Sequence, residues 1–126
     1  MPLVRISLRA GKTPEYIRDI ADSLYAAMRA DFAVPEDDRF MLVSQHAGDE
    51  FMYDPGYLGI ERSDDLVIVQ ITANNTRTLA QKQAFFRQAA QNLSQSPGLR
   101  PEDVFISLVE VPKENWSFGN GIAQYA

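Results

Sequence analysis

Apolar and polar residues alternate from Leu3 to Leu8, a pattern that predicts a β-strand. Thr13 and Pro14 then mark a helix start, because threonine is a good N-cap and proline suits the first helical position. The helix is expected to end near Phe32. The apolar residues that predict its buried face recur at helical spacing: Ile17, Ile20, Ala21, Leu24, Ala27 and Met28.

The second half of the chain repeats this order. Residues 65–72 read as a strong strand, and Thr78 with Gln81 forms a capping box that opens a second helix, expected to stop before Pro97. A last strand is predicted over residues 104–109. The side chains expected to point inward from the second helix are Leu79, Phe86, Ala90 and Leu93.

A short internal repeat supports a duplicated architecture. Residues 35–37 and residues 101–103 are both Pro-Glu-Asp, and each precedes a strand, at residues 39–44 and 104–109. The expected fold is α/β (α+β): one domain over residues 1–126, with β-α-β halves at about 2–46 and 65–111 and a C-terminal segment, 112–126. The halves form a mixed four-stranded sheet with two helices on one face. Residues 51–60 are expected to form a small hairpin or an extended loop.

This topology predicts which residues meet. The strands of a right-handed β-α-β unit are parallel, so the first two strands start at the same edge of the sheet. If the two units join in antiparallel sense, the third and fourth strands end at that edge. The residues expected to converge there are Pro2, Asp38, Arg77, Trp116 and Phe118.

Composition excludes several function classes. The chain has 126 residues and a net charge of −5, with no basic run, so no nucleic acid and no anionic membrane surface is expected as a partner. Cysteine is absent and His46 is the one histidine, so no metal site and no thiol chemistry is expected. No long apolar run or signal peptide is recognisable, which favours a soluble, cytoplasmic protein.

The converging residues suit proton transfer on a small oxo-acid. Removal of Met1 would expose the secondary amine of Pro2, and α-amino groups titrate near neutral pH. Arg77, next to a helix N-terminus, would bind a carboxylate, and Asp38 would orient or deprotonate a water or hydroxyl. The side chains of Trp116 and Phe118 would line the pocket and exclude solvent. The implied chemistry is enolisation or loss of a β-carboxylate.

Each of these residues also has a purely structural interpretation. Asp38 can cap a turn, Arg77 can be a solvated charge, and Trp116 and Phe118 can belong to a core or an interface. If Met1 is retained, Pro2 is an amide nitrogen without basicity. The alternative function is therefore a non-catalytic small-carboxylate-binding or assembly domain on the same fold.

Four segments together resemble a known family. Pro2, the Val-Pro-x-x-Asp-Arg segment at residues 34–39, residues 43–46 and the Trp-Ser-Phe-Gly-x-Gly segment at 116–121 resemble the malonate semialdehyde decarboxylase-like branch of the tautomerase superfamily. The resemblance implies a homotrimer without metal or organic cofactor. It also implies Pro2 as the catalytic amine, Asp38 as its acidic partner, and Trp116 and Phe118 near the pocket.

One position departs from that family. The decarboxylase carries two arginines spaced Arg-x-Arg before the second helix; here Arg77 matches the second and Asn75 stands in place of the first. An asparagine amide has neither the positive charge of a guanidinium nor its planar pair of N–H donors that can bind both oxygens of a carboxylate. The catalytic set is thus Pro2, Asp38 and Arg77, and the substrate-binding set is Asn75, Trp116 and Phe118. Keto-enol tautomerisation is the expected minimal activity, with decarboxylation or hydration as the physiological alternatives.

Overall fold

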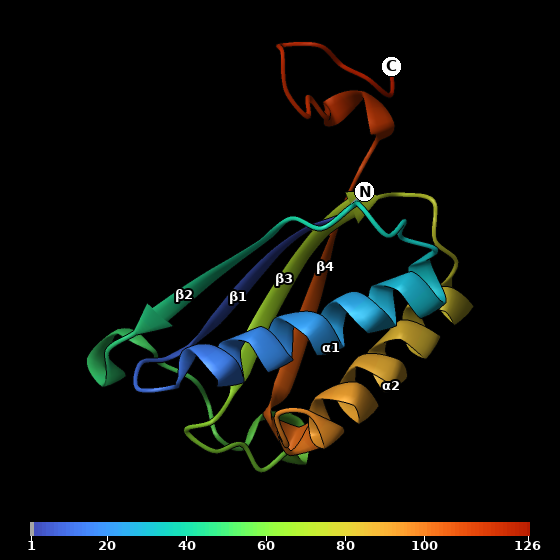
Figure 1. Ribbon diagram of the computed structural model, residues 1–126. Helices are drawn as coiled ribbons and strands as arrows, with labels where there is room; N and C mark the ends of the chain where they lie inside the picture. Colours follow the sequence, from blue (N-terminus) through green and yellow to red (C-terminus); the bar gives the residue numbers. More distant parts are fainter. Residues whose placement is uncertain (1) are drawn as a thin grey trace.

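A computed structural model describes residues 2–126 of the chain. It is a four-stranded sheet with two long helices and four short 3-10 turns (Figure 1). The strands and helices are β1 (Leu3–Arg9), α1 (Pro14–Phe32), β2 (Met41–His46), β3 (Val67–Asn74), α2 (Leu79–Gln95) and β4 (Val104–Val111).

The sheet confirms the predicted duplication. Its strand order is β2-β1-β3-β4. β1 pairs with β2 and β3 pairs with β4 in parallel, while β1 and β3 are antiparallel. The starts of β1 and β2 therefore lie at the same edge as the ends of β3 and β4, and the segments around these ends are brought together.

Both helices cover one face of the sheet (Figure 1). The side chain of Thr13 accepts a hydrogen bond from the Tyr16 N–H at the start of α1, and Thr78 and Gln81 form a complete capping box at the start of α2. Phe32 of α1 stacks on Phe85 of α2 with ring centroids 4.4 Å apart. The predicted helix starts are confirmed, and the core lies between this helical layer and the sheet.

The buried face of α2 differs from the prediction. Phe85, Ala89 and Leu93 are buried, whereas Leu79 is 70% exposed and Phe86 is 38% exposed. Ala90 is only half-buried. Two apolar stripes run along α2, and the stripe that contacts α1 and the central strands is the one through Phe85. The expected inward positions of Leu79 and Phe86 were wrong for this reason.

The remaining differences concern boundaries. β2 begins two residues later than predicted, β3 is shifted two residues toward the C-terminus, and β4 runs on to Val111. The segment 51–60 forms no strand. It is an extended loop with a 3-10 turn at Tyr57–Gly59, next to another at Gly48–Glu50.

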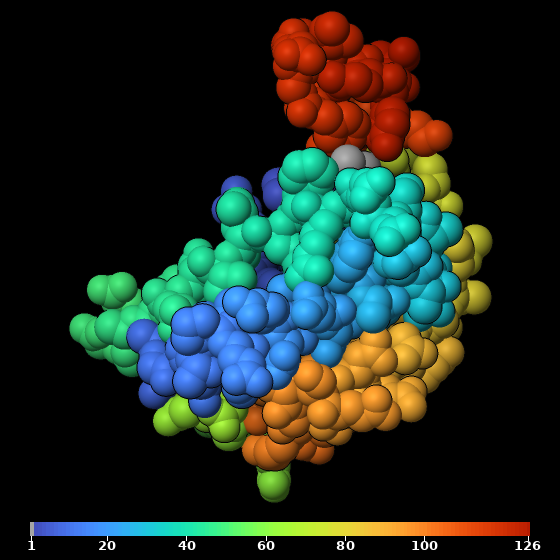
Figure 2. Space-filling model, in the orientation of Figure 1, coloured from blue at the N-terminus to red at the C-terminus, as the bar shows by residue number. Residues whose placement is uncertain are grey.

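The other face of the sheet is uncovered and carries exposed apolar side chains. On β2, Leu42 is 51% exposed. On β4, Phe105 is 44% exposed and Val109 is 37% exposed. Beyond β4, residues 112–126 leave the body of the protein and stand out at the edge where β1 begins (Figures 1 and 2). Across residues 2–126, no helix is long and apolar enough to cross a membrane.

Candidate active site

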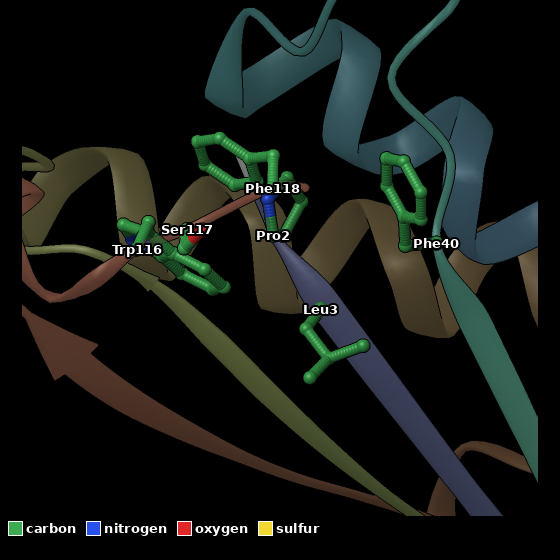
Figure 3. A pocket seen from close by; sticks show the side chains of 6 residues that line it. All are labelled: Pro2, Leu3, Phe40, Trp116, Ser117 and Phe118. Atoms are coloured by element: carbon green, nitrogen blue, oxygen red, sulfur yellow. The ribbon is translucent and has the colours of Figure 1, made fainter. Parts of the chain in front are cut away.

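A pocket of about 200 Å³ lies at the edge where β1 begins. Three chain segments build it: the start of β1, the segment that leads into β2, and the segment after β4 (Figure 3). Most of its lining is apolar. The lining residues are Pro2, Leu3, Phe40, Trp116, Ser117 and Phe118.

Trp116 and Phe118 form one wall of the pocket, as predicted from their place after β4. Their rings stack with centroids 5.4 Å apart and an interplanar angle of 17°. The indole Nε1–H of Trp116 donates a hydrogen bond of 2.8 Å to Oδ1 of Asn74, the last residue of β3. Asn74 is 6% exposed and Trp116 is half-buried, so this bond is partly shielded from water and ties the C-terminal segment to the sheet.

Arg77 is held against the end of α1. Its Nη2 donates to the carbonyl oxygen of Phe32 at 2.9 Å, and the guanidinium lies 5.1 Å from the centroid of the Phe32 ring. Burial lowers the pKa of Arg77, while the negative charges of Asp38 and Glu110 oppose that shift. Glu110 is already paired with Lys82 at 2.6 Å. Asp38 contributes the largest of the charge effects that oppose the lowered pKa of Arg77.

Asp38 is buried, at 8% exposure, two residues before Phe40 of the pocket lining. Burial raises the pKa of its carboxyl, and the positive charge of Arg77 partly opposes this rise. A carboxyl with a raised pKa exchanges protons more readily near neutral pH than an exposed one. The charges of Asp38 and Arg77 thus influence each other, although neither side chain contributes to the pocket lining.

Asn75 is placed differently from the other predicted residues. It is exposed, and its backbone N–H donates to the carbonyl oxygen of Val111 at 3.0 Å. It does not line the pocket, so its role in substrate binding stays a prediction. The asparagine that contacts the pocket wall is its neighbour Asn74. The expected removal of Met1 concerns a residue outside the described range.

Four residues of the site were not singled out from the sequence: Leu3, Phe40, Asn74 and Ser117. Their available signal was closeness in the chain to predicted positions. Leu3 follows Pro2, and Ser117 lies between Trp116 and Phe118. Phe40 follows the predicted start of the second strand at residue 39. Asn74 is likewise the neighbour of the predicted residue Asn75, but its bond to Trp116, 42 residues further along the chain, has no signal in the sequence. Within residues 2–126, no group of three or more His, Asp or Glu side chains suits a metal ion.

The raised pKa of Asp38 predicts a pH-dependent stability. A carboxyl whose folded-state pKa exceeds its unfolded value stabilises the fold below the unfolded pKa, and this contribution is lost as pH rises through the folded pKa. The free energy of unfolding of Asp38→Asn, minus that of the wild type, should therefore increase between pH 3 and pH 6. Urea denaturation at several pH values measures this difference in the free energy of unfolding. Asp37→Asn, at an exposed position, is the control. A difference that falls with pH would contradict the assignment.

The two joined β-α-β units, with an apolar pocket at the first residue of β1, define an α+β protein with the tautomerase fold. Residues 38–119 match the Tautomerase_2 family, described as tautomerase enzyme. The chain belongs to this family, whose members are enzymes, and the resemblance inferred from the sequence is confirmed.

Individual proteins show how close the similarity is. A curated protein of Bacillus subtilis (strain 168), "Probable tautomerase YusQ", is 41% identical over 124 residues, covering 98% of each chain. A crystal structure of malonate semialdehyde decarboxylase is 33% identical with a TM-score of 0.92, covering 98% of this chain and 95% of that one. A fused 4-OT wild-type symmetric trimer, 22% identical with a TM-score of 0.78, covers 95% and 94% and shares the fold.

Proposed function

We propose that this protein is a cofactor-independent tautomerase that uses the amino group of Pro2, after removal of Met1, as general acid and base on a small oxo-acid. The observation that carries the proposal is the position of Pro2. It is buried at the start of β1, in the wall of an apolar pocket whose lining residue Phe40 follows the buried Asp38 by two positions. Membership of the tautomerase family supports the same chemistry.

The two titratable groups give a balanced proton cycle for ketonisation of an enol. The Asp38 carboxylate accepts the proton of the enol hydroxyl as the carbonyl forms. The protonated Pro2 amine donates a proton to the neighbouring carbon, which becomes sp³. The substrate gains one proton and loses one, and transfer of a proton from Asp38 back to Pro2 restores the starting state. The reverse sequence enolises the ketone.

Arg77 and the start of α2 would bind the substrate carboxylate. Arg77 directly precedes the capping residue Thr78, and the free N–H groups in the first turn of α2 would add their positive partial charge. The stacked rings of Trp116 and Phe118 would exclude water from the reacting carbon, which strengthens these charge interactions. The pocket volume of about 200 Å³ suits a substrate with few carbon atoms.

Decarboxylation of malonate semialdehyde is the second candidate, favoured by the similarity to the malonate semialdehyde decarboxylase structure. In that reaction the C–C bond to the carboxylate breaks and carbon dioxide leaves. The electron pair forms an enolate, and the protonated Pro2 amine delivers a proton to its carbon to give acetaldehyde. Both reactions pass through an enol or enolate, so the same amine serves either.

A time course on two substrates separates these activities. Protein with an authentic Pro2 terminus is incubated with phenylenolpyruvate and, separately, with malonate semialdehyde. Ketonisation without decarboxylation identifies the tautomerase. Decarboxylation that is lost in Arg77→Ala identifies the decarboxylase. Absence of both reactions, with small carboxylates still binding, would support the non-catalytic binding domain instead.

The assembly that fits this function is a homotrimer. Related structures of this fold include trimers, and the uncovered sheet face carries apolar side chains that a second copy would bury. Sedimentation equilibrium should give three times the mass of one chain. Leu42→Glu on that face should shift the protein toward smaller species, while Leu58→Glu, on an exposed loop, should not. A monomeric wild type would contradict the proposal.

A further inference from the structure

The C-terminal segment, residues 112–126, is joined to the sheet at its start and by one side-chain hydrogen bond. At its start, Val111 pairs with Asn74 in the ladder between β3 and β4. The indole Nε1–H of Trp116 then donates to Oδ1 of the same Asn74, at 2.8 Å. Among the hydrogen bonds of the described residues, 2–126, no other joins this segment to the rest of the protein. Asn74 therefore holds both ends of the turn that leads into the pocket wall.

Contacts inside the segment make the wall a single unit. The ring of Trp116 stacks on the ring of Phe118, and the ring of Tyr125 meets Phe118 edge-on, with centroids 4.9 Å apart. The side chain of Gln124 accepts a hydrogen bond from the Phe118 N–H at 3.0 Å and donates one to the Gly119 carbonyl oxygen at 2.9 Å. Because these contacts are local, they move with the segment, and the bond to Asn74 is the hydrogen bond that fixes the unit to the sheet.

The sheet alone does not explain an asparagine at the end of β3. Asn74 pairs with Val111 through the backbone, as residues of any type can in a β-ladder. Its side chain is 6% exposed, and burial of an amide costs free energy unless the amide is hydrogen-bonded. The bond from Trp116 satisfies the amide oxygen. The side chain of Asn74 therefore suits a role in holding Trp116 and not a role in strand pairing.

The position of the wall decides whether the pocket is closed. Trp116 and Phe118 belong to the C-terminal segment, whereas Pro2 and Phe40 belong to the body of the protein (Figure 3). A rotation of the segment about the residues after Val111 would widen the pocket and admit water to Pro2. The bond between Trp116 and Asn74 opposes this rotation, because it fixes a second point of the segment.

We propose that Asn74 is a positioning residue of the active site, whose side-chain oxygen holds Trp116, and with it the aromatic wall, in place before the substrate binds. The inference rests on the proposed function for the reaction, and Asn74 acts through Trp116 because it does not line the pocket itself. Without the bond, the wall is in place in only a fraction of the molecules. The apparent affinity for the substrate then falls in proportion to that fraction.

The fluorescence of Trp116, the one tryptophan of the chain, reports the state of the wall without any substrate. Asn74→Leu and Asn74→Ala remove the acceptor, the first with little change in size, and circular dichroism confirms that each variant is folded. Both should shift the emission of Trp116 to longer wavelengths and increase its quenching by acrylamide, because the half-buried indole becomes hydrated. Asn115→Leu, at the exposed neighbour of Trp116, is the matched control and should leave the emission and the quenching as in the wild type.

Kinetics with phenylenolpyruvate give a second readout. Asn74→Leu should raise KM about tenfold, since a hydrogen bond is lost and a donor is left unpaired, and kcat should stay within about twofold. Asn74→Asp keeps an acceptor oxygen, and Arg77, which lines the same small cavity as Asn74, balances the added charge. This variant should restore KM to within about threefold of the wild type. A residue needed only for folding would not divide KM from kcat in this way.

Two results would overturn the positioning role. One is an unchanged emission and quenching of Trp116 in both Asn74→Leu and Asn74→Ala, because the bond then does not hold the wall. The other is a loosened wall with an unchanged KM. The fluorescence also separates this inference from the proposed function. If Trp116 loosens in both variants but the wild type does not ketonise phenylenolpyruvate, Asn74 holds the wall and only the catalytic proposal fails. If ketonisation depends on Pro2 while fluorescence and KM are unchanged, only the positioning role fails.

Discussion

One extra residue ahead of Pro2 is expected to abolish catalysis. It converts the amine of Pro2 into a tertiary amide nitrogen, which neither accepts nor carries a proton at neutral pH. General acid–base catalysis contributes about 10²–10⁴-fold, and Pro2 is the proposed proton donor to carbon, so kcat/KM should fall by at least about a thousandfold. The fold should be unchanged, because Pro2 lines the pocket and is not part of the hydrophobic core cluster. The rate of ketonisation of phenylenolpyruvate measures the effect. Intact mass spectrometry confirms which residue begins each protein.

Two variants control for the chemistry of this terminus. Pro2→Ala replaces the secondary amine with a primary one and should retain part of the activity, because a proton-accepting nitrogen is still present. Pro55→Ala makes the same substitution in the remote loop after Asp54 and should be fully active. Full activity of the extended protein would show that the Pro2 amine takes no part in the reaction.

Asp38→Asn is expected to lower kcat/KM about a hundredfold while the protein stays folded. The amide has nearly the shape of the carboxyl but cannot accept the enol proton. Burial raises the pKa of the Asp38 carboxyl, which makes it a better proton acceptor than an exposed aspartate. The loss should fall mainly on kcat, because the step removed is proton transfer. Steady-state kinetics with phenylenolpyruvate measure it.

Asp37→Asn is the matched control for that experiment. Asp37 is the adjacent residue, carries the same side chain and is exposed, so its substitution changes the net charge by the same amount. It should remain within about twofold of the wild type. Equal losses in both variants would show a general effect of charge near the pocket, and an active Asp38→Asn would remove Asp38 from the catalytic set.

The convergence of the site residues could be predicted because it follows from topology. Hydrophobic periodicity located the strands and helices, and handedness made each pair of strands parallel. The antiparallel pairing of β1 with β3 then brought Pro2 and the residues after β4 to one edge of the sheet. Only the sequence order of the elements was needed for this step, so boundary errors of two residues did not disturb it.

Contacts that depend on side-chain packing could not be predicted. The bond between Trp116 and Asn74 joins a strand end to a segment without regular structure, and no local pattern specifies it. The buried face of α2 was wrong because Leu79 and Phe86 fit a helical stripe as well as Phe85 does. The choice between them is made by α1, through the stacking of Phe32 on Phe85. Asn75 was chosen by resemblance alone, and it lies exposed beside the asparagine that is bonded to the pocket wall.

The most direct test of the central claim is the rate at which protein beginning at Pro2, verified by intact mass, converts phenylenolpyruvate to its keto form. The account predicts a rate well above that of buffer, which returns to the buffer rate when one residue precedes Pro2. A rate equal to that of buffer for the authentic protein, or one unaffected by the added residue, would contradict the claim that the Pro2 amine is the catalytic group.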